Sequence, residues 1–70
     1  MVHYRLTAKL NEQHEIWYGI HAVEDETIIA QAEDLSEDSC TVRRYVKRLN
    51  QMHTELTDFL HQADTWKTKG

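Results

Sequence analysis

The chain has 70 residues, of which 40% are apolar and 29% charged, with two glycines, no proline and one cysteine. This size predicts a single domain over residues 1–70 and excludes a second one, with too little interior for a roomy pocket. Eight basic and twelve acidic residues give a net charge of −4, which argues against the overall basic surface of a nucleic-acid-binding domain.

The sequence contains neither a membrane span nor a secretion signal. No apolar run approaches the roughly 18 to 20 residues that a transmembrane helix needs, and the start MVHYRLTAKL lacks the apolar segment of a signal peptide. The lone Cys40 excludes an internal disulfide, which is typical of a reducing compartment. We therefore expect a cytoplasmic protein.

The first half of the chain alternates apolar and polar residues, as half-buried strands do. The alternation runs over about residues 2–10, 16–23 and 27–34, and short polar stretches separate the three segments. These segments predict three strands in an antiparallel meander.

The apolar faces also restrict how these strands pair, because a slip of one residue would turn every side chain to the other face. For the first hairpin we expect Leu10 opposite Ile16 and, further along, Leu6 opposite Ile20. For the second we expect Tyr18 opposite Ala32, and registers shifted by two residues in either direction remain open.

The period changes to that of a helix after the strands. One helix is predicted over about residues 37–50, with Ser36 and Ser39 as candidate N-caps, and a second over about 54–66, with Thr54 as its cap. Residues 67–70 are expected to form a frayed tail.

These elements predict an α+β fold, in which a C-terminal helical hairpin packs on one face of a three-stranded antiparallel meander (βββαα). The apolar positions of both periods predict its core: Tyr4, Leu6, Tyr18, Ile20, Ile28, Val42, Val46, Leu49, Leu56, Phe59 and Leu60.

Two runs, WYGIHAVEDETIIAQAEDLSED and VRRYVKRLNQMHTELTDFL, resemble a family of small uncharacterised proteins from Firmicutes that is catalogued as a domain of unknown function. The resemblance covers about residues 4–61. Its most specific parts are Tyr18-Gly19-Ile20, Asp34-Leu35-Ser36, Asp58-Phe59-Leu60 and the spacing from Leu49-Asn50 to Leu56. It implies a three-strand, two-helix domain of bacterial cytoplasmic origin, and it implies no activity.

The residue types that carry chemistry do not form a recognisable motif. Five histidines are present, but no two have the His-x3-His spacing of a helical metal site. Cys40 follows Glu37 and Asp38, which oppose a thiolate, and no histidine is near it in sequence. Gly19 is the one internal glycine, which excludes a glycine-rich phosphate loop. We expect no catalytic residue, no metal, no cofactor and no small-molecule substrate, and therefore not an enzyme.

A basic cluster on the first predicted helix supports one alternative. Its members are spaced i,i+4 beside the apolar stripe: Arg43, Arg44, Lys47 and Arg48. Such a patch could meet phosphates, as in a small nucleic-acid-binding regulator. The competing interpretations are a solvated face and ion pairs with Glu55 and Asp58.

The sheet face opposite the helices is the expected partner surface. Trp17, Val23 and Ile29 project from it, with Lys9 beside Trp17, and exposed apolar groups in a small domain often mark an interface. The two edge strands offer a second route to association. We therefore predict an interaction module that forms a homodimer or docks to another protein through its sheet, with no membrane partner.

Overall fold

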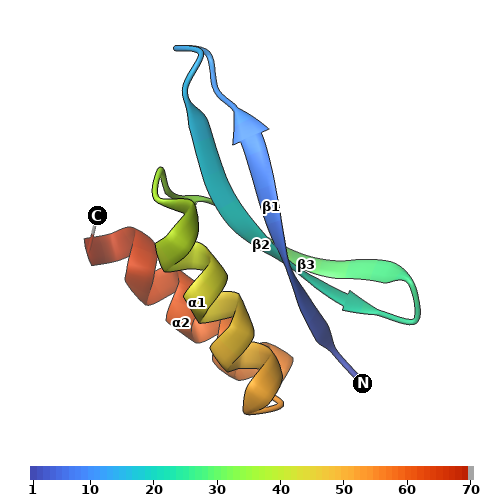
Figure 1. The fold of residues 1–70 in the computed structure, drawn as a ribbon. Helices are drawn as coiled ribbons and strands as arrows, with labels where there is room; N and C mark the ends of the chain where they lie inside the picture. The colour runs from blue at the N-terminus through green and yellow to red at the C-terminus, as the bar shows by residue number, and fades with distance from the viewer. Residues whose placement is uncertain (70) are drawn as a thin grey trace.

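A computed structural model describes the backbone of residues 1–69 and the side chains of residues 1–66. The chain forms three strands and then two helices: β1 (His3–Leu10), β2 (Ile16–Glu24), β3 (Thr27–Ser36), α1 (Ser39–Gln51) and α2 (Leu56–Lys69). The strands pair antiparallel in the order β1-β2-β3, and both helices lie on one side of the sheet (Figure 1). The predicted α+β arrangement is confirmed.

The ends of the elements differ from the predicted ones by a few residues. The strand β3 continues to Ser36 rather than residue 34, and α2 continues to Lys69 rather than residue 66. The predicted frayed tail is therefore helical as far as Lys69, while Gly70 lies outside the described residues.

The N-cap of α1 is Asp38 and not one of the two serines. Its carboxylate accepts hydrogen bonds from the Thr41 hydroxyl at 2.8 Å and from the Cys40 N–H at 3.0 Å. These bonds favour the ionised form, so they lower the pKa of Asp38. Ser36 lies two residues before Asp38, and its hydroxyl accepts a hydrogen bond from the Asp38 N–H.

Thr54 does not start α2, which begins two residues later at Leu56. Its backbone instead ties the turn between the helices to the rest of the fold: the Thr54 N–H donates to Leu49 O at 3.1 Å, and the Thr54 carbonyl accepts from the Tyr4 hydroxyl at 2.6 Å. The predicted cap is wrong because this threonine belongs to the connection.

The register of the first hairpin is confirmed, with Leu10 opposite Ile16 and Leu6 opposite Ile20. The expected register of the second hairpin is wrong at Tyr18, and the alternative shifted by two residues holds at Ile20. Ala32 faces Ile20, two residues along from the predicted Tyr18, whereas Tyr18 faces Ser36. Two bulges cause the difference, one between Tyr18 and Ile20 and one between Ala22 and Val23.

The second of these bulges changes the face to which Ile28 belongs. Ala22 pairs with Ala30 and Val23 pairs with Ile28, so Ile29 is the extra residue. Paired residues share a face, and Ile28 therefore lies with Val23 on the face away from the helices. Its 48% exposure contradicts the predicted core position.

Gly19 is needed at the other bulge because β3 passes close above it. A Cβ on this residue would lie 2.4 Å from the Ala32 carbonyl oxygen and 2.9 Å from Glu33 Cα. Asp34, within this bulge, has a φ of 56°, and Ser36 pairs with Tyr18 before the chain enters α1. The glycine thus permits the bend that brings α1 over the sheet.

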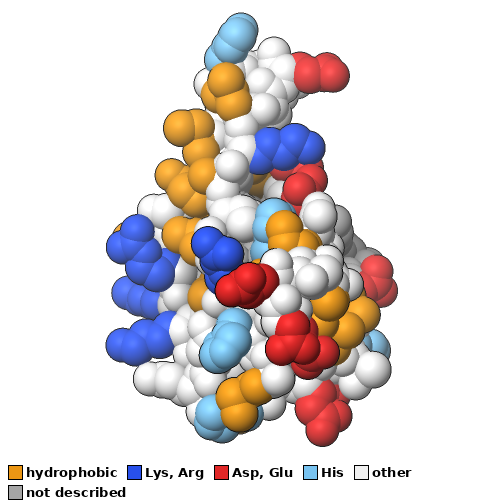
Figure 2. All heavy atoms as spheres, turned by 90° about the vertical axis from the view of Figure 1, so that its right-hand side faces the viewer, with side chains coloured by type: hydrophobic (Ala, Val, Ile, Leu, Met, Phe, Trp, Pro, Cys, Tyr) orange, Lys and Arg blue, Asp and Glu red, His pale blue; other side chains and the backbone are white. Residues whose placement is uncertain are grey.

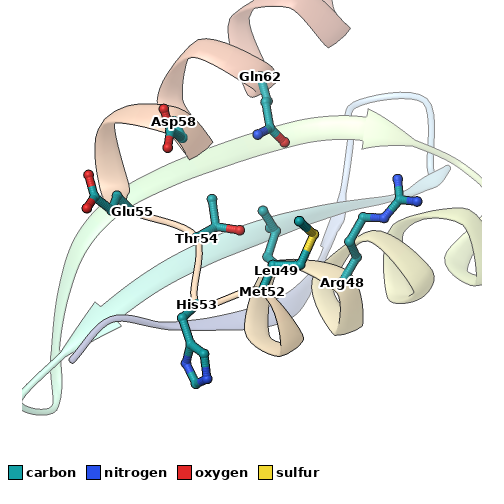
Figure 3. A pocket seen from close by; sticks show the side chains of 8 residues that line it. All are labelled: Arg48, Leu49, Met52, His53, Thr54, Glu55, Asp58 and Gln62. Atoms are coloured by element: carbon teal, nitrogen blue, oxygen red, sulfur yellow. The ribbon is translucent and has the colours of Figure 1, made fainter.

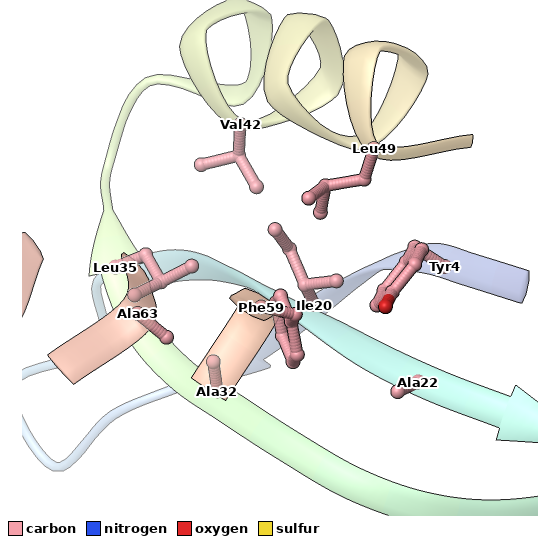
Figure 4. Close-up of a cluster of buried hydrophobic side chains, with 9 residues drawn as sticks. All are labelled: Tyr4, Ile20, Ala22, Ala32, Leu35, Val42, Leu49, Phe59 and Ala63. Atoms are coloured by element: carbon pink, nitrogen blue, oxygen red, sulfur yellow. The ribbon is translucent and has the colours of Figure 1, made fainter. Parts of the chain in front are cut away.

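The core lies between the sheet and the two helices (Figure 4). Its buried members are Tyr4, Ile20, Ala22, Ala32, Leu35, Val42, Leu49, Phe59 and Ala63. Leu6, Tyr18, Val46 and Leu56 pack against it while partly exposed. Leu60 is 44% exposed, contrary to prediction, because Phe59 and Ala63 form the inward-facing i,i+4 pair of α2 and the next position points away from it.

Tyr4 joins the first strand to both helices. Its ring centroid lies 4.9 Å from that of Phe59, and its backbone N–H and C=O both bond to the Asn50 side-chain amide at 2.9 Å. Burial raises the pKa of Tyr4, since the neutral phenol is the form that suits an apolar site.

Candidate interaction surface

The free end of the β1–β2 hairpin projects beyond the helices (Figure 1). The eight residues of β1 span about 27 Å, whereas the 13 residues of α1 span about 20 Å. Ala8 is exposed, Leu10 is 60% exposed and Ile16 is 52% exposed. Figure 2 shows hydrophobic side chains along this upper part of the molecule. We term Ala8, Leu10 and Ile16 the hairpin patch.

The outer edge of β1 is closed at one end and open at the other. Asn50 occupies the backbone groups of Tyr4, so those groups point away from β2. Along an antiparallel edge strand, the backbone groups of successive residues point alternately toward the neighbouring strand and away from it. The bond from Asn11 N–H to Glu15 O at 2.9 Å shows that the odd-numbered residue Asn11 points inward, which agrees with the even-numbered Tyr4 pointing outward. The N–H and C=O groups of Leu6, Ala8 and Leu10 therefore point outward, and no side chain in the described part of the chain bonds to them.

The outer edge of β3 is less suited to pairing. Its two bulges interrupt the regular ladder, and the charged Glu33 and Asp34 lie at one of them. Bulges and charges are the devices by which edge strands avoid adding a further strand. The open stretch of β1 is thus the flatter and less protected edge.

The predicted open-face surface does not form one patch. Lys9 is opposite Trp17 as expected, but Val23 lies at the other end of β2, and Ile29 lies near that end on β3. Six residues of strand separate Trp17 from Val23, which is about 20 Å. The structure brings Ile28 beside Val23 instead, so the two ends of this face are separate apolar regions.

Trp17 lies at the edge of a small hollow of about 140 Å³, which both apolar and charged residues line. Across it, Lys9 Nζ is 3.3 Å from a Glu33 carboxylate oxygen, and His21 Nε2 is 4.0 Å from the other. The indole Nε1 is buried, and among the described residues it has no hydrogen-bond partner. The hollow therefore combines charged groups with the Trp17 indole, and Trp17 is only partly exposed.

The basic residues of α1 form a separate surface. Arg43, Arg44, Lys47 and Arg48 are all exposed, and within the described side chains none forms an ion pair with Glu55 or Asp58 at 4.0 Å or less. Figure 2 shows Lys and Arg side chains gathered on one flank and most acidic side chains on the other. Of the two competing interpretations, the ion pairs between the helices are not found among the described side chains.

Two hollows lie between α1 and α2, and Arg48 lines both. One, of about 650 Å³, has Glu55, Asp58 and Gln62 on its α2 side (Figure 3). The other, of about 420 Å³, is lined by Arg44, Tyr45 and Trp66 as well. The Tyr45 and Trp66 ring centroids are 5.1 Å apart, so the second hollow combines cationic and aromatic groups.

The histidines and the cysteine do not gather into a site. Cys40 is exposed in the first turn of α1, and His21 lies opposite Arg5. Across the part of the chain that the structure describes, no three His, Cys, Asp or Glu side chains are placed to hold a metal ion together. Neither helix, as far as it is described, has the length and apolar character to cross a membrane.

Comparisons with known proteins do not identify a relative. No protein-family model matches the chain, and no curated protein or solved structure is significantly similar to it. The resemblance to the Firmicutes family therefore stays a prediction.

Proposed function

We propose that this protein is a small, non-enzymatic protein-interaction module that self-associates or docks to another protein through its sheet. The observation that carries the proposal is the projecting hairpin, where the hairpin patch and the open stretch of β1 coincide. Exposed apolar side chains supply contact area there, and unpaired backbone groups supply directional hydrogen bonds. Elsewhere on the sheet, exposed apolar groups occur without a regular open edge.

The proposal is tested by retention of proteins from bacterial cytoplasm on immobilised chain, with added untagged copies of the chain among the candidates. The double variant Leu10→Ser, Ile16→Ser removes the apolar contact of the hairpin patch, and we expect it to lose the retained protein. Met52→Ser is the matched control, because Met52 is 70% exposed and lies far from the hairpin at the end of α1. Equal retention by wild type and the double variant would refute the proposal.

The unpaired basic surface of α1 favours one second candidate, a small nucleic-acid-binding regulator. Its four cations are exposed and free of ion pairs with the described acidic residues, and Arg44 and Arg48 flank the Tyr45–Trp66 pair. Arginine and aromatic groups together bind phosphates and bases. The net charge of −4 weighs against this candidate.

This candidate requires that binding of DNA or RNA weaken steeply with salt, because binding releases counterions from the phosphates. Reversing Arg43, Arg44, Lys47 and Arg48 to Glu would then abolish it, while the hairpin variant Leu10→Ser, Ile16→Ser would bind normally. Nucleic-acid binding that survives the charge reversal would exclude α1 as the contact surface.

A further inference from the structure

The geometry points to a specific partner for the open edge of β1: a second copy of this chain, paired antiparallel so that Ala8 lies opposite Ala8 of the second copy. This inference rests on the proposed function and names its partner. The two sheets would join into one sheet of six strands, with a two-fold axis at Ala8.

The position of the axis follows from where the open edge begins and ends. Asn50 closes the edge at Tyr4, and the strand ends at Leu10. The outward-pointing residues between these limits are Leu6, Ala8 and Leu10, and Ala8 is their centre. Pairing about Ala8 places Leu6 opposite Leu10 of the other copy on both sides, and each opposed pair exchanges two backbone hydrogen bonds.

Charge excludes the neighbouring registers. A shift of two residues in one direction places Lys9 directly opposite Lys9 of the second copy, and a shift in the other direction places it opposite Arg5. Like charges directly opposite each other destabilise a strand pair. In the register centred on Ala8, Lys9 faces an uncharged Thr7, and Lys9 already bonds inward to Glu33 at 3.3 Å.

The same register buries the apolar groups that the monomer exposes. Leu10, 60% exposed, comes to lie beside Leu6 of the other copy, which already packs against the core. It also places Asn11 opposite Arg5, so the turn that holds the exposed Glu12 and Glu15 approaches a cation. The apolar face and the charges thus agree on one pairing.

Cysteine cross-linking tests the register in a Cys40→Ser background, since the exposed Cys40 would itself react. Opposed residues of a hydrogen-bonded pair have Cα atoms about 5.5 Å apart, within disulfide range. Ala8→Cys should therefore form a disulfide between copies at least tenfold faster than Leu10→Cys, whose two Cα atoms would be about 14 Å apart. Leu10 is highly exposed, so random collisions would favour it; equal or faster linkage at Leu10 would overturn this register.

Sedimentation of the uncross-linked protein tests the edge itself. Ala8→Pro removes an N–H that points to solvent in the monomer, where an edge strand tolerates proline, and it should weaken the dimer at least about a hundredfold. Ala8→Val keeps the N–H and should still dimerise, and circular dichroism checks that both variants fold. If Ala8→Pro failed to fold, the contrast between Ala8→Cys and Leu10→Cys would still decide the inference.

Two results would overturn the inference and locate the error. A wild-type chain that stays monomeric at high concentration would exclude the second copy; the proposed function would then survive if a hairpin-dependent partner were still retained from the cytoplasm. A dimer that Ala8→Pro preserves but Trp17→Ala disrupts would place self-association on the open face instead.

Discussion

The two ends of the β1–β2 hairpin have the same alternating pattern and opposite environments. At one end Tyr4 and Ile20 are buried beneath Leu49 and Phe59. At the other end Leu10 and Ile16 occupy the same face of the same strands but are 60% and 52% exposed. Alternation in the sequence therefore determines the face on which a strand side chain lies, whereas the length of the helices determines how much of that face is covered.

The backbone edge of β1 shows the same contrast. At Tyr4 the Asn50 amide replaces a neighbouring strand by bonding both backbone groups. At Ala8 no described side chain does so. The backbone groups at this edge are hydrogen-bonded beside the core and unpaired beyond it, so a further strand can pair with the unpaired part.

The largest expected effect comes from removing a core side chain at the covered end. Leu49 is 1% exposed, so Leu49→Ala should lower the free energy of unfolding by about 2 to 5 kcal/mol through lost burial and a new cavity. Chemical denaturation would measure this loss. An unchanged denaturation midpoint would mean that α1 does not pack on the sheet.

A smaller effect is expected where β3 bends over Gly19. A methyl group there meets the Ala32 carbonyl oxygen at 2.4 Å, so Gly19→Ala should destabilise the fold by about 1 to 3 kcal/mol as the backbone shifts. Thr7→Ala, on the strand opposite Gly19, is the control for a change on the same face without a clash. Thermal unfolding of both variants would distinguish the two causes. A larger loss in Gly19→Ala than in Thr7→Ala would show a steric clash rather than a general loss of strand propensity.

Tyr4→Phe tests the connection between β1 and the turn that precedes α2. The variant keeps the ring against Phe59 and loses the bond to the Thr54 carbonyl, at a cost of about 1 kcal/mol. Burial raises the pKa of Tyr4 in the folded state. The contribution of Tyr4 to the free energy of unfolding is therefore complete below the pKa of an unfolded tyrosine, about 10, and is lost as pH rises through the pKa of the folded state.

The free energy of unfolding, measured as a function of pH, should decrease less at alkaline pH in Tyr4→Phe than in the wild type. Burial also raises the pKa of Tyr45, so the variant should retain a smaller loss from that residue. Identical alkaline profiles for wild type and Tyr4→Phe would exclude Tyr4 as a source of the dependence.

The smallest effect is expected at the projecting end. Leu10→Ala should change the free energy of unfolding of the diluted monomer by less than about 0.5 kcal/mol, since an exposed side chain removes little from water. The same chemical denaturation would measure this change, so that the exposed Leu10→Ala can be compared with the buried Leu49→Ala. A loss of several kcal/mol at Leu10 would show that the hairpin end is covered in solution even at low concentration.

The sequence located parts of the surface, but not the hairpin patch that carries the proposed function. Lys9 opposite Trp17 follows from the strand pattern, and the exposure of the basic residues on α1 follows from the helical period. The alternating pattern does not reveal the exposure of Ala8, Leu10 and Ile16, because it does not show how far the helices cover their face. The lengths of β1 and α1 were the available signal, since a strand residue advances more than twice as far as a helical one.

The sequence by itself determined the kind and order of the elements, because the periods of strands and helices are local properties of the chain. It also restricted the first hairpin register to a few pairings that keep the apolar faces together, and the structure has the expected one. Only the tertiary structure decided the β2–β3 register, the exposure of Ile28 and the open edge at Ala8. The first two depend on the two bulges of the β2–β3 pair, one where β3 passes over Gly19 and one beside Val23. The open edge depends on where Asn50 and the helices end, and no local sequence pattern records that position.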